Sequence, residues 1–505
     1  MPVSTKKIVI NGNDLTVEQV HAVASLNAPV EIAQSAMGRV KKGRQIVDDI
    51  TNSDREVYGI TTGTGANKDV RIPQELVTEF QNRILISHCI GIKPYYSEEI
   101  VRAIMLCRAN TMAKGATGVQ PQIVEMFVDM LNAGIHPLTP MRGSVGLSDL
   151  GPMSELSLPL IGLGEVIYKD KKMPSAKALE MAGLTPLKLA AKDGISLCNN
   201  NGLTMGHGTV IINMCQQLLD TADISYALLL EGYRGNVTPL HPGVGKVRPH
   251  IGQEIVLTRV RNLLEGSFLW DSGIQGSCQD PVSLRSAVQV NGACRDALRF
   301  AKEGIEIEIN SSGDNPLVLI EENDMISNGN YHIATVVMRF EMLGIALASL
   351  ANMIGNRLTR IMTPEFANLP RFLTPDPGTS CGFSTMQKTF ASLYAEIRHL
   401  ANPAMLDALQ VANLVEDHAT MGPYVLQKTE KIIRSMHYII GMEMFVAAQA
   451  IDLIGKPKLG KGTELAYETI RSVVPALKED RLLNANIENA AKLIESGRVL
   501  QECNI

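Results

Sequence analysis

The feature that most limits how this chain can fold is a set of long segments after Gly202 in which apolar residues recur at helical spacing. An α-helix rises about 1.5 Å per residue, so segments of roughly 20 to 30 residues form rods of about 30 to 45 Å. The segments are residues 203–230, 282–303, 334–356, 383–400 and 424–454. Such rods bury their apolar faces by packing together. The sequence therefore predicts a mainly α fold, an elongated helical bundle.

The chain before Gly202 has shorter helical segments, separated by loops rich in glycine, proline and asparagine at 58–68, 137–152 and 198–206. Strand-like alternation is brief, as at 7–10 and 166–169. We predict an active-site-loop domain at 1–205 and a long-helix domain at 206–505, which forms the oligomer and part of the active site. Loops on a rigid helical scaffold are the natural place for functional residues.

Residues 334–354 are apolar on almost every side, so other helices or other subunits have to cover them, and we expect an oligomer. Arg339 and Glu341 interrupt this run, and the N-terminus has no signal-peptide core, so we expect no membrane segment. The formal charge is −5, with both signs mixed along the chain, which predicts no nucleic-acid partner. The eight scattered cysteines suit a reducing compartment. We predict a cytoplasmic protein with a small-molecule substrate.

The loop at 58–69, YGITTGTGANKD, is rich in glycine. It lacks the lysine of a P-loop and does not match the dinucleotide-binding pattern, so nucleotide binding is not favoured. Glycines permit a tight loop that fixes Tyr58 beside a cavity. A buried tyrosine with a lowered pKa can serve there as a general base.

Ser148 lies between glycine-rich flanks in GSVGLSDLGP, at 143–152. This resembles a nucleophile elbow, but Leu150 replaces the second glycine, so a serine hydrolase and a plain turn or N-cap serine both stay open. Arg285, one turn inside a predicted helix, can bind a substrate carboxylate or form a salt bridge within the protein. No HExxH motif, Cys/His cluster or carboxylate pair predicts a metal site.

Taken in order, these stretches resemble the motifs of the histidine and phenylalanine/tyrosine ammonia-lyase and aminomutase superfamily. The matches are YGITTGTG at 58–65, SHxxG at 87–91, GSVG at 143–146, DLGP at 149–152, LCN at 197–199, QDPVSLR at 279–285, DNPL at 314–317, GNYH at 329–332 and EDH at 416–418. They span most of the chain and keep the family order. The resemblance implies an α-helical homotetramer in which several subunits build each active site.

The resemblance also implies roles for single residues. Tyr58 would move the β-proton of the substrate, and Arg285 would bind its carboxylate. The supporting hydrogen bonds would come from Asn199, Gln279 and Asn315.

Tyr331 and Val282 bear on the chemistry of the reaction, and His88 and Glu416 bear on the choice of substrate. Tyr331 replaces a family phenylalanine and could restore the hydroxyl that is lost where Val282 replaces a tyrosine. His88 and Glu416 match positions that favour an imidazole-like side chain. We therefore expect a histidine-like or otherwise polar substrate.

One departure concerns the family's electrophile, a methylidene-imidazolone (MIO) that forms from an Ala-Ser-Gly tripeptide and captures the amino group. Between Gly146 and Asp149 this chain has only Leu147-Ser148, one residue fewer than the family pattern. Ring closure needs the amide nitrogen after the serine to attack the carbonyl before it, a strained approach that suits glycine rather than Asp149. We therefore predict no cofactor and no MIO. Ser148, the counterpart of the family's serine, stays a candidate catalytic residue.

The sequence thus predicts an ammonia-lyase-family enzyme that eliminates across, isomerises or adds to the α,β-bond of a small amino acid or related carboxylate without MIO. A conventional MIO-dependent histidine or aromatic amino acid ammonia-lyase or aminomutase, with Leu147-Ser148-Asp149 cyclised, is one alternative. A non-catalytic homologue that binds a metabolite is another. The retention of Tyr58, Asn199 and Arg285 argues against the second alternative.

Overall fold

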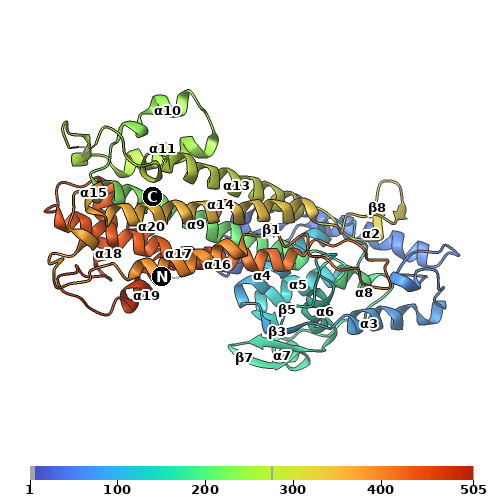
Figure 1. Cartoon of the computed structure of the whole chain (residues 1–505). Coiled ribbons are helices and arrows are strands. Elements are labelled where there is room, and N and C mark those ends of the chain that lie inside the picture. The colour runs from blue at the N-terminus through green and yellow to red at the C-terminus, as the bar shows by residue number, and fades with distance from the viewer. Residues whose placement is uncertain (1–5, 275–276, 504–505) are drawn as a thin grey trace. The chain divides into compact units, whose positions relative to one another are not determined.

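The computed structural model describes residues 6–274 and 277–503 (Figure 1). The chain forms two compact units, each assembled from three stretches of the sequence. Unit 1 comprises Met1–Asn213, Ala301–Phe340 and Pro403–Gln427, and unit 2 comprises Met214–Phe300, Glu341–Asn402 and Lys428–Ile505. The prediction of a mainly α-helical protein is confirmed.

Three of the predicted long segments are single helices: α9 (Gly202–Tyr233), α14 (Ala334–Ile361) and α17 (Gly422–Leu453) (Figure 1). Within unit 2 a buried carboxylate joins them. Glu443 on α17 accepts hydrogen bonds from the Ser225 hydroxyl on α9 at 2.8 Å and from Arg357 Nε on α14 at 2.7 Å. A buried carboxylate is strongly unfavourable without such partners, so these bonds fix how the three helices align.

Helix α14 is long and apolar enough to cross a membrane by length and composition. However, 56% of its most apolar window is buried inside the structure, as in the core helix of a folded protein. Met338, Met342 and Ile345 remain exposed on its outer side. The helix is therefore mainly a core element with one uncovered apolar strip.

The segment predicted as one helix at 282–303 is instead two, α12 (Val282–Arg285) and α13 (Ala287–Glu308). The break falls at Ser286, whose φ of −107° and ψ of 12° are not helical. The buried Tyr226 hydroxyl donates to the Leu284 carbonyl at 2.8 Å, and this bond takes the place of a helical one. The single-helix prediction is wrong because a tertiary contact captures a backbone acceptor.

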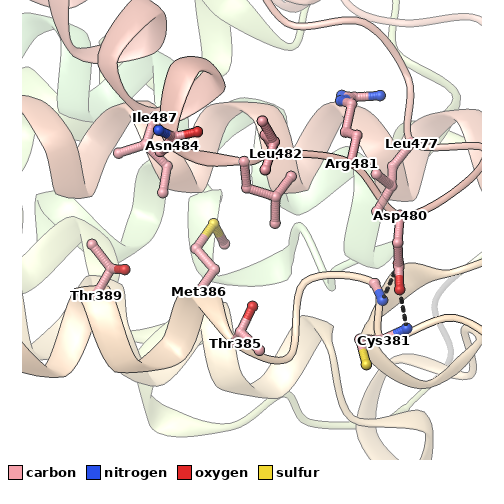
Figure 2. Close-up of a pocket in the computed structure, with 12 residues that line it drawn as sticks. Cys381, Thr385, Met386, Thr389, Leu477, Asp480, Arg481, Leu482, Asn484 and Ile487 are labelled. Atoms are coloured by element: carbon pink, nitrogen blue, oxygen red, sulfur yellow. Dashed lines mark hydrogen bonds between the residues drawn. The ribbon is translucent and has the colours of Figure 1, made fainter.

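The helix predicted at 383–400 begins later, as α16 (Met386–Leu400). The Asp480 carboxylate accepts the backbone N–H groups of Cys381 at 2.7 Å and Gly382 at 3.0 Å (Figure 2). The next N–H, that of Phe383, donates to the Phe372 carbonyl at 3.1 Å, so tertiary contacts hold the start of the predicted segment out of the helix. Gly382 has a φ of +54°. Gly382 and Asp480 also line a cavity of about 450 Å³ between α16 and the chain near Leu482, which contains none of the predicted site residues (Figure 2).

The other helices that begin in unit 2 are shorter. They are α10 (Pro242–Lys246), α11 (Ile251–Leu263), α15 (Pro364–Ala367), α18 (Lys461–Arg471), α19 (Asn484–Glu495) and α20 (Arg498–Glu502).

Unit 1 is organised around helix α4 (Glu98–Ala113), which is buried along its whole length from Ile100 onward. The other helices are α1 (Val17–Ala24), α2 (Gln34–Thr51), α3 (Val77–Ser87), α5 (Pro121–Ala133), α6 (Leu150–Ser157), α7 (Ser175–Ala182) and α8 (Asp193–Cys198). Helices α1, α2 and α5 pack against α4. An all-round buried helix of this kind fixes the elements around it.

The strands described in unit 1 are short and form small sheets. Parallel β1 (Ile8–Ile10) and β2 (Val30–Ile32) pair Ile8 with Val30, and antiparallel β3 (Ile92–Tyr95) and β5 (Pro140–Arg142) pair Tyr95 with Pro140. Strands β4 (Ile135–Pro137), β6 (Glu165–Tyr168) and β7 (Lys171–Pro174) form one antiparallel sheet, and β8 (Leu317–Leu319) and β9 (Asp324–Ile326) form a hairpin. The strand-like patterns at 7–10 and 166–169 correspond to β1 and β6.

Helix α8 packs closely against α3 and α6. A Cβ atom on Gly194 would lie 2.0 Å from the Gln81 carbonyl oxygen, so only glycine permits this approach. The Gln81 side chain also donates to the Gly59 carbonyl at 3.0 Å and accepts from the Ile195 N–H at 3.1 Å. These contacts bring the glycine-rich loop and the end of α8 to one place.

Candidate active site

A cavity of about 710 Å³ lies within unit 1, a size usual for small-molecule sites. Six of the nine predicted site residues line it, although they are scattered along the sequence. They are Tyr58, His88, Asn199, Asn315, Tyr331 and Glu416. A seventh, Ser148, is joined to this group by a hydrogen bond to Asn199.

Asn199 follows the last turn of α8 and forms the centre of a polar chain. Its Nδ2 donates to the Asn315 carbonyl at 3.1 Å, and its Oδ1 accepts from the Ser148 hydroxyl at 2.5 Å. Ser148 is buried and has a φ of +53°, a left-handed conformation that is unfavourable for a serine. The Ser148 hydroxyl is thus aimed at the cavity wall by a strained backbone.

Asp149 fixes the loop that carries Ser148. Its N–H donates to the Asn200 carbonyl at 2.8 Å, and its carboxylate accepts from the Thr204 N–H at 2.8 Å and from the hydroxyls of Thr204 and Ser144. Complete burial raises the pKa of Asp149 to about 6, while these hydrogen bonds act in the opposite direction. Both the amide and the side chain of this residue are engaged.

Tyr58 points from the glycine-rich loop into the cavity. Its hydroxyl accepts the Gly65 N–H at 2.9 Å. Burial raises the pKa of Tyr58, Glu416 and Tyr331 act in the same direction, and the Gly65 N–H lowers it. The expected lowering of its pKa is therefore not found in the chain alone.

His88 and Glu416 form a polar end of the cavity. The His88 Nδ1 lies 2.8 Å from the Ile84 carbonyl, so Nδ1 carries a hydrogen and, in the neutral ring, Nε2 is an acceptor. Burial raises the pKa of Glu416, and His88 acts to lower it. An acceptor nitrogen and a carboxylate at one end suit the N–H groups of an azole ring.

A buried charge cluster supports this part of the site. Asp314, next to Asn315, accepts from both Nη atoms of Arg108 at 3.3 Å, and Lys192 Nζ lies 3.9 Å from it. Arg108 also donates to the Ser196 carbonyl at 2.6 Å. Burial lowers the pKa of Lys192 to about 8, although Asp314 acts to raise it. The cluster ties the Asn315 segment to α8.

Gln279 and Arg285 belong to unit 2 and do not line the cavity of unit 1. With its amide oxygen turned toward Arg285, Gln279 accepts from Nε at 3.2 Å and from Nη2 at 3.1 Å. Arg285 Nη1 also donates to the Asp280 carbonyl at 3.3 Å. The two predicted substrate-binding residues therefore lie together, on a separate unit.

The sequence interpretation missed several residues that line the cavity. Lys68 belongs to the glycine-rich loop and pairs with Asp69 at 2.6 Å, but no local pattern marks it as different from an ordinary loop lysine. Leu147 and Leu150 add an apolar surface next to Ser148. Within residues 6–274 and 277–503, no group of three His, Cys, Asp or Glu residues is placed to hold a metal ion.

The family described as aromatic amino acid lyase matches residues 15–472. Histidine ammonia-lyase from Alkaliphilus metalliredigens is 39% identical over 498 residues, which is 98% of each chain. Among solved structures, the ergothioneine-degrading ergothionase from Treponema denticola has a TM-score of 0.96 and 38% identity, covering 98% of this chain and 100% of that one. Histidine ammonia-lyase from Trypanosoma cruzi has a TM-score of 0.90 and 30% identity, covering 99% and 95%.

Proposed function

This chain belongs to the aromatic amino acid lyase family and is a carbon–nitrogen lyase, and we propose that it releases trimethylamine from a histidine-type trimethylammonium betaine such as ergothioneine, without MIO. The observation that carries this proposal is the loop at Ser148. The nitrogen that would have to close the MIO ring belongs to Asp149, which has a side chain where ring closure suits glycine. Its N–H donates to the Asn200 carbonyl, and its carboxylate is held by Thr204 and Ser144. The residues present therefore do not fit the MIO group.

The leaving group decides whether an electrophile is needed. A base strong enough to take a β-proton removes a proton from a primary ammonium group first, which leaves a poor leaving group. A trimethylammonium group has no N–H to lose and departs as a neutral amine. The Cβ–H electrons then form the Cα=Cβ bond as the Cα–N bond breaks, and the product is an α,β-unsaturated acid.

Tyr58 is the proposed base for the β-proton. A fixed substrate cation about 5 Å from the phenolate would stabilise it by about 3 kcal/mol at an effective dielectric constant of ~20. This corresponds to a fall of roughly two pKa units, opposite in direction to the rise that burial causes at Tyr58. The trimethylammonium group of the substrate thus lowers the pKa of Tyr58, and a ligand without a positive charge would not.

The rest of the cavity supports this substrate class. His88 and Glu416 provide an acceptor and a carboxylate for an azole ring, and Lys68 provides a cation for its sulfur or an oxidised sulfur group. The Treponema denticola ergothionase was solved with desmethyl-ergothioneine sulfonic acid. Leu147 and Leu150 offer apolar surface for methyl groups.

We further propose that the active form is a homotetramer in the cytoplasm in which other subunits supply Gln279 and Arg285 to each site. Support comes from the division of the chain, because these residues belong to unit 2 and the residues that line the cavity belong to unit 1. The exposed apolar strip on α14 supports assembly as well, because subunit contacts cover such surfaces. Light scattering gives the mass of the particle, and a monomer would contradict the proposal.

The reaction is tested by incubating the purified protein with ergothioneine, histidine trimethylbetaine and histidine. We expect trimethylamine and a conjugated acid from one or both betaines, no ammonia from histidine, and an intact mass equal to that of the unmodified chain. The names of the curated relatives favour one other candidate, a conventional histidine ammonia-lyase. Ammonia from histidine, with a deficit of two waters mapped to residues 147–149, would establish that candidate instead.

A further inference from the structure

Two histidines from distant parts of the chain meet beside the cavity. His332 Nε2 and His418 Nδ1 lie 2.9 Å apart, and the ring centroids are 5.0 Å apart with the planes tilted by 33°. The two residues are 86 positions apart, so the fold alone brings them together. At this distance the two nitrogens share one hydrogen, with one ring donating and the other accepting.

Each histidine directly follows residues that line the cavity. Tyr331 precedes His332, and Glu416 and Asp417 precede His418. Tyr58, Tyr331 and Glu416 line the same cavity, and Tyr331 and Glu416 both act to raise the pKa of Tyr58. The contact between the histidines therefore joins the loop that carries Tyr331 (the Tyr331 loop) to the loop that carries Glu416 (the Glu416 loop).

The loop before His332 is fastened to the asparagines of the site. The N–H of Asn328 donates to the Asn315 side chain at 3.0 Å, and the Tyr331 carbonyl accepts from Asn201 at 2.9 Å. Tyr331 is thus held on the side of the cavity that carries Asn199 and Asn315.

The loop before His418 is fastened to the Ser148 loop. Val411 and Glu416 form an antiparallel bridge that closes its tip, and the Thr420 hydroxyl donates to the Gly146 carbonyl at 2.7 Å. The N–H of Met421 donates to the Val145 carbonyl at 2.7 Å. The histidine contact lies between this anchored end and the tip that carries Glu416.

We propose that His332 and His418 are positioning residues, whose shared hydrogen bond holds the Tyr331 loop against the Glu416 loop so that both side chains face Tyr58 and the azole end of the substrate. The expected effect on catalysis rests on the proposed function, whereas the hydrogen bond between the two histidines does not. Neither histidine lines the cavity, so each acts through its neighbour in the chain.

The chain allows isosteric substitutions at both positions. The side-chain amide of glutamine reaches the position of a histidine Nε2, and that of asparagine reaches the position of Nδ1. His332→Gln and His418→Asn therefore keep a donor and an acceptor at the contact, whereas His332→Leu and His418→Leu remove it. We expect about a tenfold fall in kcat for either leucine variant, the scale of one lost hydrogen bond, and less than about threefold for the amide variants. Because both leucine variants lose the same contact, the double leucine variant should be no worse than either.

Amide hydrogen exchange of the substrate-free protein tests the contact between the histidines independently of the reaction. His332→Leu should speed the exchange of the amides at 411–416, although they are far away in sequence, and His332→Gln should not. His250→Leu, a change at an exposed histidine in unit 2, is the matched control. Leucine variants with unchanged exchange and unchanged kcat would overturn the inference. Coupled exchange in a protein that releases no trimethylamine would support the inference and contradict the proposed reaction.

Discussion

The Ser148 hydroxyl donates to the Asn199 side-chain oxygen at 2.5 Å, in the loop where relatives of this chain are expected to form an electrophile. Ser148 has a left-handed backbone at this contact, with a φ of +53°. The proposed function takes Ser148 as an unmodified alcohol, whereas a MIO-dependent reaction would consume it.

Replacing Ser148 by alanine should therefore lower kcat by no more than about tenfold, because only one hydrogen bond to Asn199 is lost. Ser154→Ala, on the neighbouring helix α6, is a control for the removal of a buried hydroxyl close to the site. Steady-state kinetics with the betaine substrate gives the comparison. Complete loss of activity would instead indicate a serine that is consumed in making MIO.

Replacing Tyr58 by phenylalanine should lower kcat at least about a hundredfold, because the base for the β-proton is removed. Tyr331→Phe removes another phenol of the same cavity and should cost much less. The measurement is the rate of trimethylamine release at saturating substrate, with thermal unfolding to show that both variants fold. Near-wild-type turnover by the Tyr58 variant would remove it from the mechanism.

Replacing Asp149 by asparagine should change how stability depends on pH. The pKa of Asp149 is raised to about 6 from an ordinary value of about 3.9, so the folded state binds the extra proton between these values. The proton bound at Asp149 stabilises the folded state fully below about pH 4, and this contribution is lost as the pH rises through 6. The free energy of unfolding changes by on the order of 3 kcal/mol over this range. Asparagine has the same size as aspartate and no charge to bury, so above pH 6 the variant should be more stable than the wild type.

Thermal unfolding of both proteins at pH 4.5 and pH 7.5 measures this effect. Asp271→Asn, at an exposed carboxylate, serves as the control and should show no such crossover. An Asp149 variant that is less stable than the wild type at pH 7.5 would show that the hydrogen bonds to Thr204 and Ser144 outweigh the burial of the charge.

Shared active sites predict complementation between inactive variants. Tyr58→Phe and Arg285→Ala should each be nearly inactive alone. Unfolded together and reassembled at random, they should recover activity in about a quarter of the sites, those with both wild-type residues. No recovery, while mixtures of wild type with either variant reassemble normally, would mean that one subunit supplies both residues.

Much of the site could be read from the sequence because its groups lie in short local patterns. Tyr58, Asn199 and Glu416 lie on the cavity as the family motifs indicated. Lys68 lies there too, but no local pattern distinguished it from an ordinary loop lysine. In the sequence Leu147 stands out only as part of the altered tripeptide, whereas in the structure its side chain lines the cavity.

Helical periodicity is a local property, so the sequence by itself determined that the chain is mainly α-helical and which stretches form its long helices. The tertiary structure alone decided where those helices stop, because distant groups compete for backbone donors and acceptors. Tyr226 takes the Leu284 carbonyl, and Asp480 takes the N–H groups before α16. The same reason applies to the contact of His332 with His418 and to the burial of Asp149, which depend on packing between loops far apart in the sequence.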